Sequence, residues 1–235
     1  MKERCCAYCG KRNAHLTKDH VFPKSLYPPS KAGSRVQRLT VPACRQCNQR
    51  WSDDEAYFRD ILAVAGEANA PRQELWKSKV LPSFGKVDGR RRVCDLFREM
   101  VSFKTSDGGT RYMVYPGRDG RVMRVVKKII RGLSFYHEIA SPLSEQQVWA
   151  DVMTYSMPRE ALEQMKYHPR EQDIAEYRYV VLNEDGINSW WLITFFNQVQ
   201  FVGAVSISAA GLSWKGWHTG LQEPSNVTIC RGIAQ

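Results

Sequence analysis

The chain has 235 residues, of which 43% are hydrophobic and 11% aromatic, a composition typical of a globular protein with a hydrophobic core. The sequence has no apolar run of the roughly 18 residues needed to cross a bilayer, and its N-terminus has no apolar segment like that of a secretory signal. We therefore expect a protein of the reducing cytoplasm without a membrane partner. The net charge of +10 is unevenly distributed: residues 1–51 carry 11 Lys and Arg against 2 Asp and Glu, a net +9, whereas residues 133–235 carry 6 against 11, a net −5. The basic block at 1–51 favours nucleic acid as a partner.

Two Cys-x-x-Cys pairs, Cys6/Cys9 and Cys44/Cys47, organise residues 1–51, which have no long periodic apolar segment. Each pair presents two sulfurs to one point, and four thiolates in two pairs suit one tetrahedral structural zinc ion. Zinc–thiolate binding supplies much of the folding free energy of small lobes. We therefore expect short strands, turns and one short helix held by zinc, with a set of reduced core cysteines as the alternative.

Three cysteines lie outside these pairs. Cys5 adjoins Cys6 and is an alternative ligand with less suitable spacing. Cys94 and Cys230 stand alone in the sequence, and we expect both to be buried thiols.

Asp19 and His20 lie between the two cysteine pairs and are followed by Val21-Phe22-Pro23. We expect them to end a short strand, in which extended backbone would point their side chains to opposite faces. A metal ligand and a base placed side by side there would need a local distortion of the backbone. Residues 22–35 contain several prolines and a glycine and are predicted to form a loop.

The next segments alternate between helical patterns and breaks. Ser52 and Glu55 form a capping-box pattern at the start of a predicted helix over 53–66, and a second helical stretch is expected at about 71–80. Residues 84–92 contain two glycines and three consecutive arginines, which predict a linker or an exposed turn.

Residues 110–137 are predicted to hold a β-hairpin and then a helix. Strands at 110–115 and 121–123 flank the sequence Pro-Gly-Arg-Asp-Gly, which is a strong turn signal. Over 124–137 apolar residues recur at helical spacing, and four cations are expected on the opposite face: Arg124, Lys127, Lys128 and Arg131. That face could lie against a DNA backbone, but an ordinary amphipathic helix packed on a sheet is the favoured interpretation.

The C-terminal half is predicted to contain a short helix and an antiparallel meander. The helix is expected over 161–167, after a proline. Three segments rich in β-branched and aromatic residues predict the strands of the meander: 176–183, 189–198 and 200–208. We expect the earlier hairpin to belong to the same sheet.

Three N-terminal segments carry a specific set of motifs: CAYCG at 6–10, LTKDHVFPK at 16–24 and VPACRQCN at 41–48. On these residues the chain resembles the HNH endonuclease family, and the likeness extends to SDDEAYFR at 52–59. The resemblance implies a ββα-metal core, in which two strands and a helix hold a catalytic divalent cation beside a structural zinc. It covers about the first quarter of the chain.

The resemblance assigns roles to three residues. His20 would be the general base that takes a proton from the attacking water, and Asp19 and Asn48 would hold a catalytic Mg²⁺ or Mn²⁺ through hard oxygen ligands. The implied reaction is hydrolysis of DNA phosphodiesters to a 5′-phosphate and a 3′-hydroxyl, with RNA left open as a substrate.

The sequence departs from the family at its central asparagine, which orients the catalytic histidine. The stretch 36–41 reads VQRLTV, in which Gln37 carries the same amide group and is the candidate for this role. We also take Lys24, Arg45 and Arg50 as candidate phosphate contacts, with ordinary surface cations as the alternative.

We thus predict an α+β protein in three parts. These are a zinc-stapled ββα-metal lobe at 1–66, a helical connector at 67–92, and an α+β domain with an antiparallel sheet at 93–235. The last part is expected to serve targeting, sensing or dimerisation, by contact with a second copy or another protein. Two alternatives to a nuclease stay open: a zinc-stabilised nucleic-acid-binding module without catalysis, and a scaffold in which zinc stabilises a protein contact.

Overall fold

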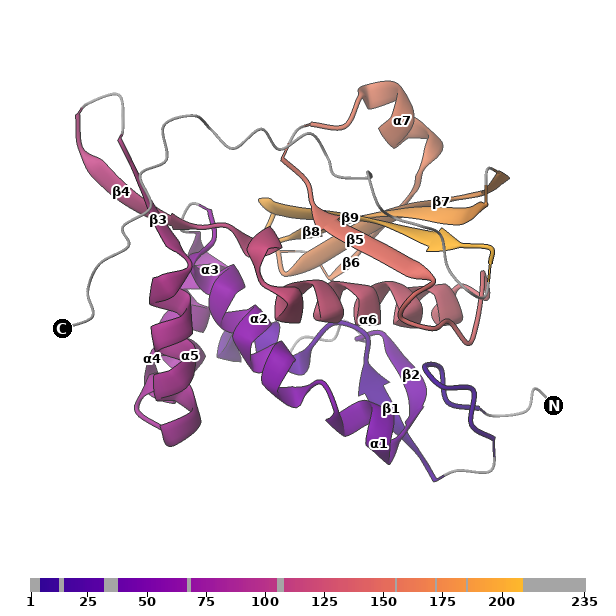
Figure 1. Ribbon diagram of the computed structural model, residues 1–235, viewed down its shortest axis with the longest axis horizontal. Helices are drawn as coiled ribbons and strands as arrows, with labels where there is room; N and C mark the ends of the chain where they lie inside the picture. Colours follow the sequence, from indigo (N-terminus) through magenta and orange to yellow (C-terminus); the bar gives the residue numbers. More distant parts are fainter. Residues whose placement is uncertain are drawn as a thin grey trace.

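The computed structural model describes residues 5–208 except 13–14, 32–37, 67–68, 105–107, 155, 172 and 185. The fold is α+β with antiparallel sheets, as predicted, and a long central helix lies between the largest sheet and the N-terminal strands (Figure 1). Gln37 and Cys230 lie outside the described residues. Among the described helices, none combines the length and the apolar character needed to cross a bilayer.

The largest sheet has five antiparallel strands in the order β5-β9-β8-β7-β6. Their bounds are β5 Val148–Val152, β6 Lys166–Glu171, β7 Ala175–Glu184, β8 Ile187–Phe195 and β9 Val199–Ser206. The predicted three-stranded meander is confirmed as β7, β8 and β9. The short helix α7, Arg159–Gln164, ends earlier than predicted because Lys166 already pairs with Tyr179 in the ladder of β6 and β7.

Helix α6, Gly120–Tyr136, crosses one face of this sheet (Figure 1). Its apolar face is fully buried, as the helical spacing predicts: Val125, Val126, Ile129, Ile130 and Leu133. The sheet approaches this face closely at Gly203 of β9, where a Cβ atom would overlap Ile130 Cδ1 and lie 2.9 Å from the Trp149 carbonyl oxygen. Helix α6 and the sheet therefore form the centre of the hydrophobic core.

The N-terminal segment forms a small strand–strand–helix unit. Strand β1, Leu16–His20, pairs with β2, Thr40–Cys44, in antiparallel register, and helix α1, Arg45–Gln49, follows directly. Two 3₁₀ turns, η1 Lys24–Leu26 and η2 Pro29–Lys31, lie in the predicted loop. The unit has the short elements that the sequence predicts.

Helix α2, Ser52–Val64, is confirmed, but the predicted capping box is wrong. Trp51 holds the N-cap position, and the Ser52 hydroxyl donates instead to the Gln49 carbonyl oxygen at 2.9 Å. The Glu55 carboxylate accepts a hydrogen bond from Lys128 at 2.9 Å. Ser52 thus bonds to the preceding turn and Glu55 to Lys128 of α6, and neither side chain caps α2.

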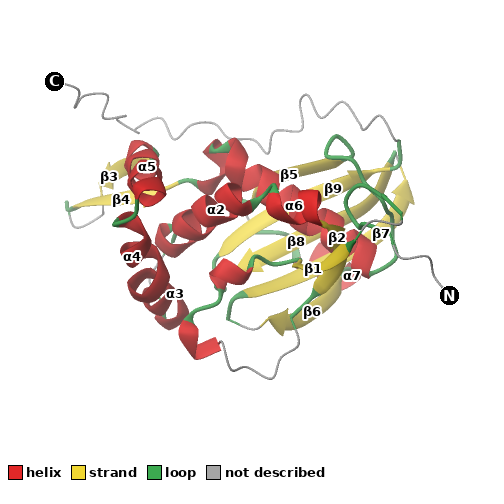
Figure 2. Cartoon of the chain, turned by 90° about the horizontal axis from the view of Figure 1, so that it is seen from below, coloured by secondary structure: helices red, strands yellow, loops and turns green. Residues whose placement is uncertain are grey.

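The segment after α2 is helical for most of its length. It contains α3 Ala70–Leu75, a π-helical stretch η3 Trp76–Val80, α4 Leu81–Phe84 and α5 Val87–Arg98. These helices lie beside the sheet rather than over it (Figure 2). The predicted linker or exposed turn at 84–92 is limited to a turn at 85–86, because α5 begins at Val87 and Gly89 allows it to pack directly on the backbone at Ser83 and Phe84, where a side chain would overlap.

The predicted hairpin over 110–123 is also wrong. Residues 121–123 begin helix α6, and the Asp119 side chain accepts from the Arg121 backbone N–H at 2.8 Å as the helix N-cap. Strand β4, Thr110–Val114, pairs with β3, Met100–Lys104, in a separate two-stranded sheet, and the short turn η4, Pro116–Arg118, leads to the helix. The Pro-Gly-Arg-Asp-Gly sequence therefore introduces a helix and does not connect two strands.

One hydrophobic cluster contains residues from all three predicted parts of the chain. The Phe22 and Phe195 rings lie 6.0 Å apart between the N-terminal unit and the sheet, and Phe58 lies 5.3 Å from Phe195. Leu75 of the predicted connector belongs to the same cluster. The domain boundaries at 66/67 and 92/93 stay a prediction.

The contact at Gly203 predicts a large stability difference between two glycine-to-alanine substitutions. Gly203→Ala should lower the free energy of unfolding by about 1–3 kcal/mol, because the new Cβ meets both α6 and the fixed backbone of β5. Gly120→Ala is the control, since its Cβ would have no neighbour closer than 3.7 Å. Urea unfolding measures both, and equal midpoints for the two variants would contradict this packing.

Candidate functional site

The four predicted zinc ligands converge in the structure. The Sγ atoms of Cys6, Cys9, Cys44 and Cys47 all lie within 4.8 Å of one another, and the Cys9–Cys44 distance is 3.9 Å. Tetrahedral zinc with Zn–S bonds of about 2.3 Å sets its sulfurs roughly 3.8 Å apart, so the cluster is compatible with a structural metal such as zinc.

Local backbone geometry places these sulfurs. Residues 7–9 form a turn closed by a hydrogen bond from the Gly10 N–H to the Cys6 carbonyl oxygen at 2.9 Å, and Gly10 has φ +69°, which favours glycine. Cys44 ends β2, and Cys47 lies one turn into α1. Burial raises the pKa of the Cys6 thiol, but hydrogen bonds to the backbone of neighbouring residues outweigh it and lower this pKa to about 7.

The other cysteines are placed differently from the ligands. Cys5 is half-buried and does not belong to the cluster. Cys94 is exposed on α5, which contradicts the prediction of a buried thiol. The prediction rested on the isolation of this cysteine in the sequence, but α5 turns the position toward solvent.

Asp19 is buried and engaged in two strong contacts. Its Oδ2 atom accepts from the Tyr8 hydroxyl at 2.5 Å and lies 2.8 Å from the Lys128 ammonium group. Tyr8 belongs to the first cysteine turn, and Lys128 belongs to α6. Burial and then the negative charge of Asp19 raise the pKa of Tyr8 well above its usual value, so the hydroxyl stays a proton donor.

Lys128 has three acceptors and no exposed side-chain surface. Its ammonium group contacts Asp19 Oδ2, Glu55 Oε1 at 2.9 Å and the His20 carbonyl oxygen at 2.7 Å. These partners satisfy the three donors of an ammonium group. Burial raises the pKa of Glu55, and the charge of Lys128 acts against this increase.

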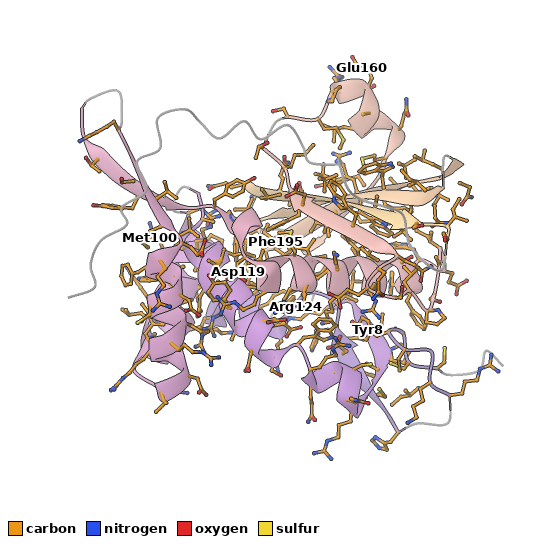
Figure 3. All side chains as sticks on the ribbon, in the orientation of Figure 1. Tyr8, Met100, Asp119, Arg124, Glu160 and Phe195 are labelled. Atoms are coloured by element: carbon orange, nitrogen blue, oxygen red, sulfur yellow. The ribbon has the colours of Figure 1, made fainter. Side chains whose placement is uncertain are left out.

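The prediction that four cations of α6 face away from the core is wrong for two of them. Lys128 is 1% exposed and Arg131 is 6% exposed. Arg131 donates to the backbone carbonyl oxygens of Leu143 and Tyr8 at 2.8 and 2.6 Å. Tyr8 and Arg124 lie on the side of α6 that faces the N-terminal strands (Figure 3).

His20 is half-buried, and its Nδ1 atom is buried without a hydrogen-bond partner among the described residues. Burial lowers the pKa of this imidazole, and the positive charge of Arg38 lowers it further, while Asp19 acts in the opposite direction. The environment thus favours a neutral ring. A neutral imidazole with a free nitrogen can accept a proton.

Asn48 lies on α1 and faces the same side of β1 as Asp19. Its Nδ2 group donates to Thr17 Oγ1 at 2.8 Å, and Thr17 and Asp19 are two residues apart in the strand. The Thr17 hydroxyl in turn donates to the Ala43 carbonyl oxygen at 3.0 Å. No described hydrogen bond joins Asp19, His20 and Asn48 to one another.

Asp19 and Asn48, the predicted ligands of a divalent cation, each keep one side-chain oxygen outside the described hydrogen bonds. Asp19 Oδ1 and Asn48 Oδ1 have no hydrogen-bond donor in the described part of the chain, because the partners of these side chains occupy Oδ2 and Nδ2. Carboxylate and amide oxygens are the ligands that Mg²⁺ and Mn²⁺ prefer.

The candidate phosphate contacts are all exposed: Lys24 in η1, Arg45 at the start of α1, and Arg50 after it. Arg50 stacks 4.3 Å above the Trp51 ring and lies 3.9 Å from Glu145, so part of its charge is compensated. The described residues give Arg45 and Lys24 no carboxylate partner.

Sequence reasoning missed Tyr8, Glu55 and Lys128 as residues of this site. The available signal was the spacing of Arg124, Lys128 and Arg131, which places three cations on one stripe of a helix. A stripe of this kind can also match acidic residues elsewhere, as Arg124 does with Asp54 at 2.8 Å.

Comparison with protein-family models, with curated proteins and with solved structures finds no match for this chain. Its function is therefore inferred from the residues of the site.

The convergent sulfurs predict the metal content of two cysteine variants. Cys44→Ser should reduce bound zinc from one ion per chain to none and unfold the N-terminal unit, because three thiolates hold zinc less firmly and this lobe depends on it. Cys94→Ser is the matched control, since this cysteine is exposed and outside the cluster. Elemental analysis of the purified proteins measures both, and one zinc per chain in Cys44→Ser would show that the ligand set is wrong.

The burial of Lys128 predicts a strong effect on stability. Lys128→Met should lower the free energy of unfolding by about 3–5 kcal/mol, because it leaves the Asp19 and Glu55 carboxylates buried without their cation. Arg124→Met, one turn earlier, removes an ion pair whose arginine side chain is 43% exposed and should cost at most about 1 kcal/mol. Similar urea midpoints for the two variants would contradict the role given to Lys128.

Proposed function

We propose that this chain is a metal-dependent nuclease of the HNH type that hydrolyses phosphodiester bonds in DNA. In this proposal the N-terminal unit is a ββα-metal lobe, the four-cysteine cluster holds structural zinc, and Asp19, His20 and Asn48 form the reactive site. The observation that carries the proposal is the placement of these three residues on β1 and α1, the two elements that adjoin the cysteine cluster.

The chemistry starts at His20. Its neutral imidazole takes a proton from a water molecule, and the resulting hydroxide attacks the phosphorus atom while the bond to the 3′-oxygen breaks and that oxygen takes up a proton from solvent. Asp19 and Asn48 would hold the divalent cation through their Oδ1 atoms. A bound cation would neutralise charge that develops on the phosphate and on the leaving oxygen. The products are a 5′-phosphate and a 3′-hydroxyl.

The contacts of Lys128 and the electrostatics of the N-terminal unit support this chemistry. Lys128 fixes both the Asp19 carboxylate and the His20 carbonyl oxygen, so it limits movement of the two adjacent residues. The lowered pKa of His20 keeps its ring neutral and able to accept a proton near neutral pH. Gln37 stays the candidate for orienting His20, and the net +9 of residues 1–51 favours a polyanionic substrate.

A second candidate function is nucleic-acid binding without cleavage. The contact between Asp19 and Lys128 favours it, because the ammonium group compensates the charge of a carboxylate that would otherwise attract the divalent cation. The broader roles proposed for residues 93–235 are contacts with a second copy or a protein partner.

The proposed base predicts the outcome of a plasmid-nicking assay. With Mg²⁺ or Mn²⁺ the wild type should convert supercoiled plasmid to nicked or linear DNA, and EDTA should stop the reaction. His20→Ala should reduce the rate at least about 100-fold, the usual contribution of a general base, and should retain zinc and DNA binding. His15→Ala is the control, because His15 is exposed one residue before β1.

Two outcomes would contradict parts of this proposal. Cleavage by His20→Ala at the rate of the control would remove His20 from its role. A wild type that binds DNA and never cuts it would favour the binding module.

A further inference from the structure

Helix α5 carries more positive charge than its contacts with the protein use. Residues 86–98 contain five lysines and arginines against two aspartates. With 3.6 residues per turn, Arg91 and Arg98 lie on the side of α5 opposite the buried Leu96, and Arg90 flanks them. All three arginines are exposed, and we call them the arginine face of α5.

The opposite side of α5 is firmly held by the rest of the protein. Leu96 is 1% exposed, and Gly89 packs directly on the backbone at Ser83. Arg92 Nε lies 2.8 Å from Oδ2 of Asp60, which is fully buried. A helix fixed in this way presents the arginine face without a further loss of backbone freedom, which favours binding.

The arginine face has little compensating negative charge. The described ion pairs of the α5 arginines involve Arg92 and Arg98, and none involves Arg90 or Arg91. The Arg98 side chain is 77% exposed, and its ion pair with Asp95 is long, at 3.5 Å. The other oxygen of that carboxylate already lies 2.9 Å from an arginine of α6.

Helix α7 is a useful comparison, because its exposed arginine is compensated. The Arg159 side chain is 86% exposed and pairs with Glu163, one turn later, at 2.8 Å. On α5 the exposed carboxylate is Asp88 in the first turn, and no described ion pair joins it to the arginine face. Cations collected on one face without such partners repel one another and attract a polyanion.

Helix α5 and the N-terminal unit extend from the same side of the molecule. Helices α4, α5 and α1 all project away from the five-stranded sheet (Figure 1). Helix α2 begins two residues after α1, packs against α5, and lies between α5 and the β1–β2 strands (Figure 2). Its 13 residues span about 20 Å, which is the rise of roughly six base pairs of B-DNA. A duplex bound at the N-terminal unit is therefore close enough in scale to reach α5.

We propose that the arginine face of α5 binds the phosphate backbone of a DNA duplex that lies across the N-terminal unit. The proposal rests on the nuclease function above and deepens it, because it gives α5 a part in holding the substrate. The charged oxygens of a phosphodiester accept hydrogen bonds from guanidinium groups, and such contacts position a duplex without reading its sequence. The net +9 of residues 1–51, on the same side of the molecule, favours DNA over an acidic protein as the occupant.

The test compares two exposed arginines on different helices. Arg91 belongs to the arginine face, whereas Arg159 belongs to α7, which lies on the far side of the five-stranded sheet (Figure 1). Binding is measured with a duplex of about 20 base pairs, which is long enough to reach both α1 and α5. Fluorescence anisotropy is recorded in EDTA at several salt concentrations, so that no cleavage occurs.

Arg91→Gln should weaken binding roughly tenfold, which is the effect of losing about one charge-assisted hydrogen bond. It should also reduce the slope of log K against log salt by about 0.9, the value for one phosphate contact, and loss of all three arginines should reduce it by about 2.7. Arg91→Lys keeps the charge and should keep most of the slope. Arg159→Gln should change the affinity less than about twofold, because it removes no phosphate contact. Equal losses for Arg91→Gln and Arg159→Gln, or no loss for Arg91→Gln, would overturn the proposal.

A stability measurement separates this role from a structural one. Without DNA, Arg91→Gln should unfold at the same urea concentration as the wild type, because this side chain is exposed and has no ion pair within the described residues. A clearly lower midpoint would show that Arg91 supports the fold, and would overturn the proposal.

The binding assay also distinguishes this proposal from the proposed reaction. A wild type that binds DNA through Arg91 but does not cut it would overturn hydrolysis and leave the arginine face standing. A wild type that cuts DNA, with Arg91→Gln equally tight at every salt concentration, would overturn the arginine face alone and favour an acidic protein as its partner. Failure of the wild type to bind DNA at all would overturn both.

Discussion

The structure around the site depends on one buried ammonium group. Lys128 of α6 binds Asp19 on β1, Glu55 on α2 and the His20 carbonyl oxygen, so a single charge joins three elements that are far apart in the sequence. An ammonium group is costly to bury unless its donors are all satisfied, and here three acceptors meet that need. The apolar face of α6 packs on the five-stranded sheet, and Lys128 of the same helix binds the N-terminal strand β1. Helix α6 therefore fixes the N-terminal strands relative to the sheet. The sheet therefore supports the site without contributing an atom to it.

The ladder of β1 and β2 is held at both of its ends. Leu16 pairs with Cys44 at the end where the sulfurs converge, and His20 pairs with Thr40 at the other end, about 13 Å away for five residues of strand. Tyr8 connects the two ends, because it belongs to the first cysteine turn and its hydroxyl binds Asp19. Loss of a metal held by the four cysteines would thus affect Asp19 through Tyr8 as well as through the strand. The sulfur cluster and Lys128 are two parts of one restraint on the same strands.

The parts of the fold that follow from local chemistry could be predicted from sequence. Cys-x-x-Cys spacing predicts the sulfur cluster, alternating β-branched and aromatic residues predict β7, β8 and β9, and helical spacing predicts α6. The wrong predictions concern sequence patterns that are compatible with two different local structures. Pro-Gly-Arg-Asp-Gly suits a hairpin turn and also a helix N-cap, and only the continuation of the apolar pattern into α6 favours the second. The burial of Lys128 could not be predicted, because its partners, Asp19 and Glu55, lie more than 70 residues away.

The distribution of paired and unpaired cations decides which surface can receive a polyanion. On α6, Arg121 pairs with Asp119 and Asp95, Arg124 pairs with Asp54, and Lys128 is fully buried. Of the four cations predicted on one face of this helix, Arg124 is paired and Lys128 and Arg131 are buried, which favours the interpretation of an amphipathic helix packed on a sheet. In the N-terminal unit, the exposed Lys24 and Arg45 have no carboxylate partner among the described residues. Exposed positive charge thus remains on the N-terminal unit, which also holds the residues proposed for hydrolysis.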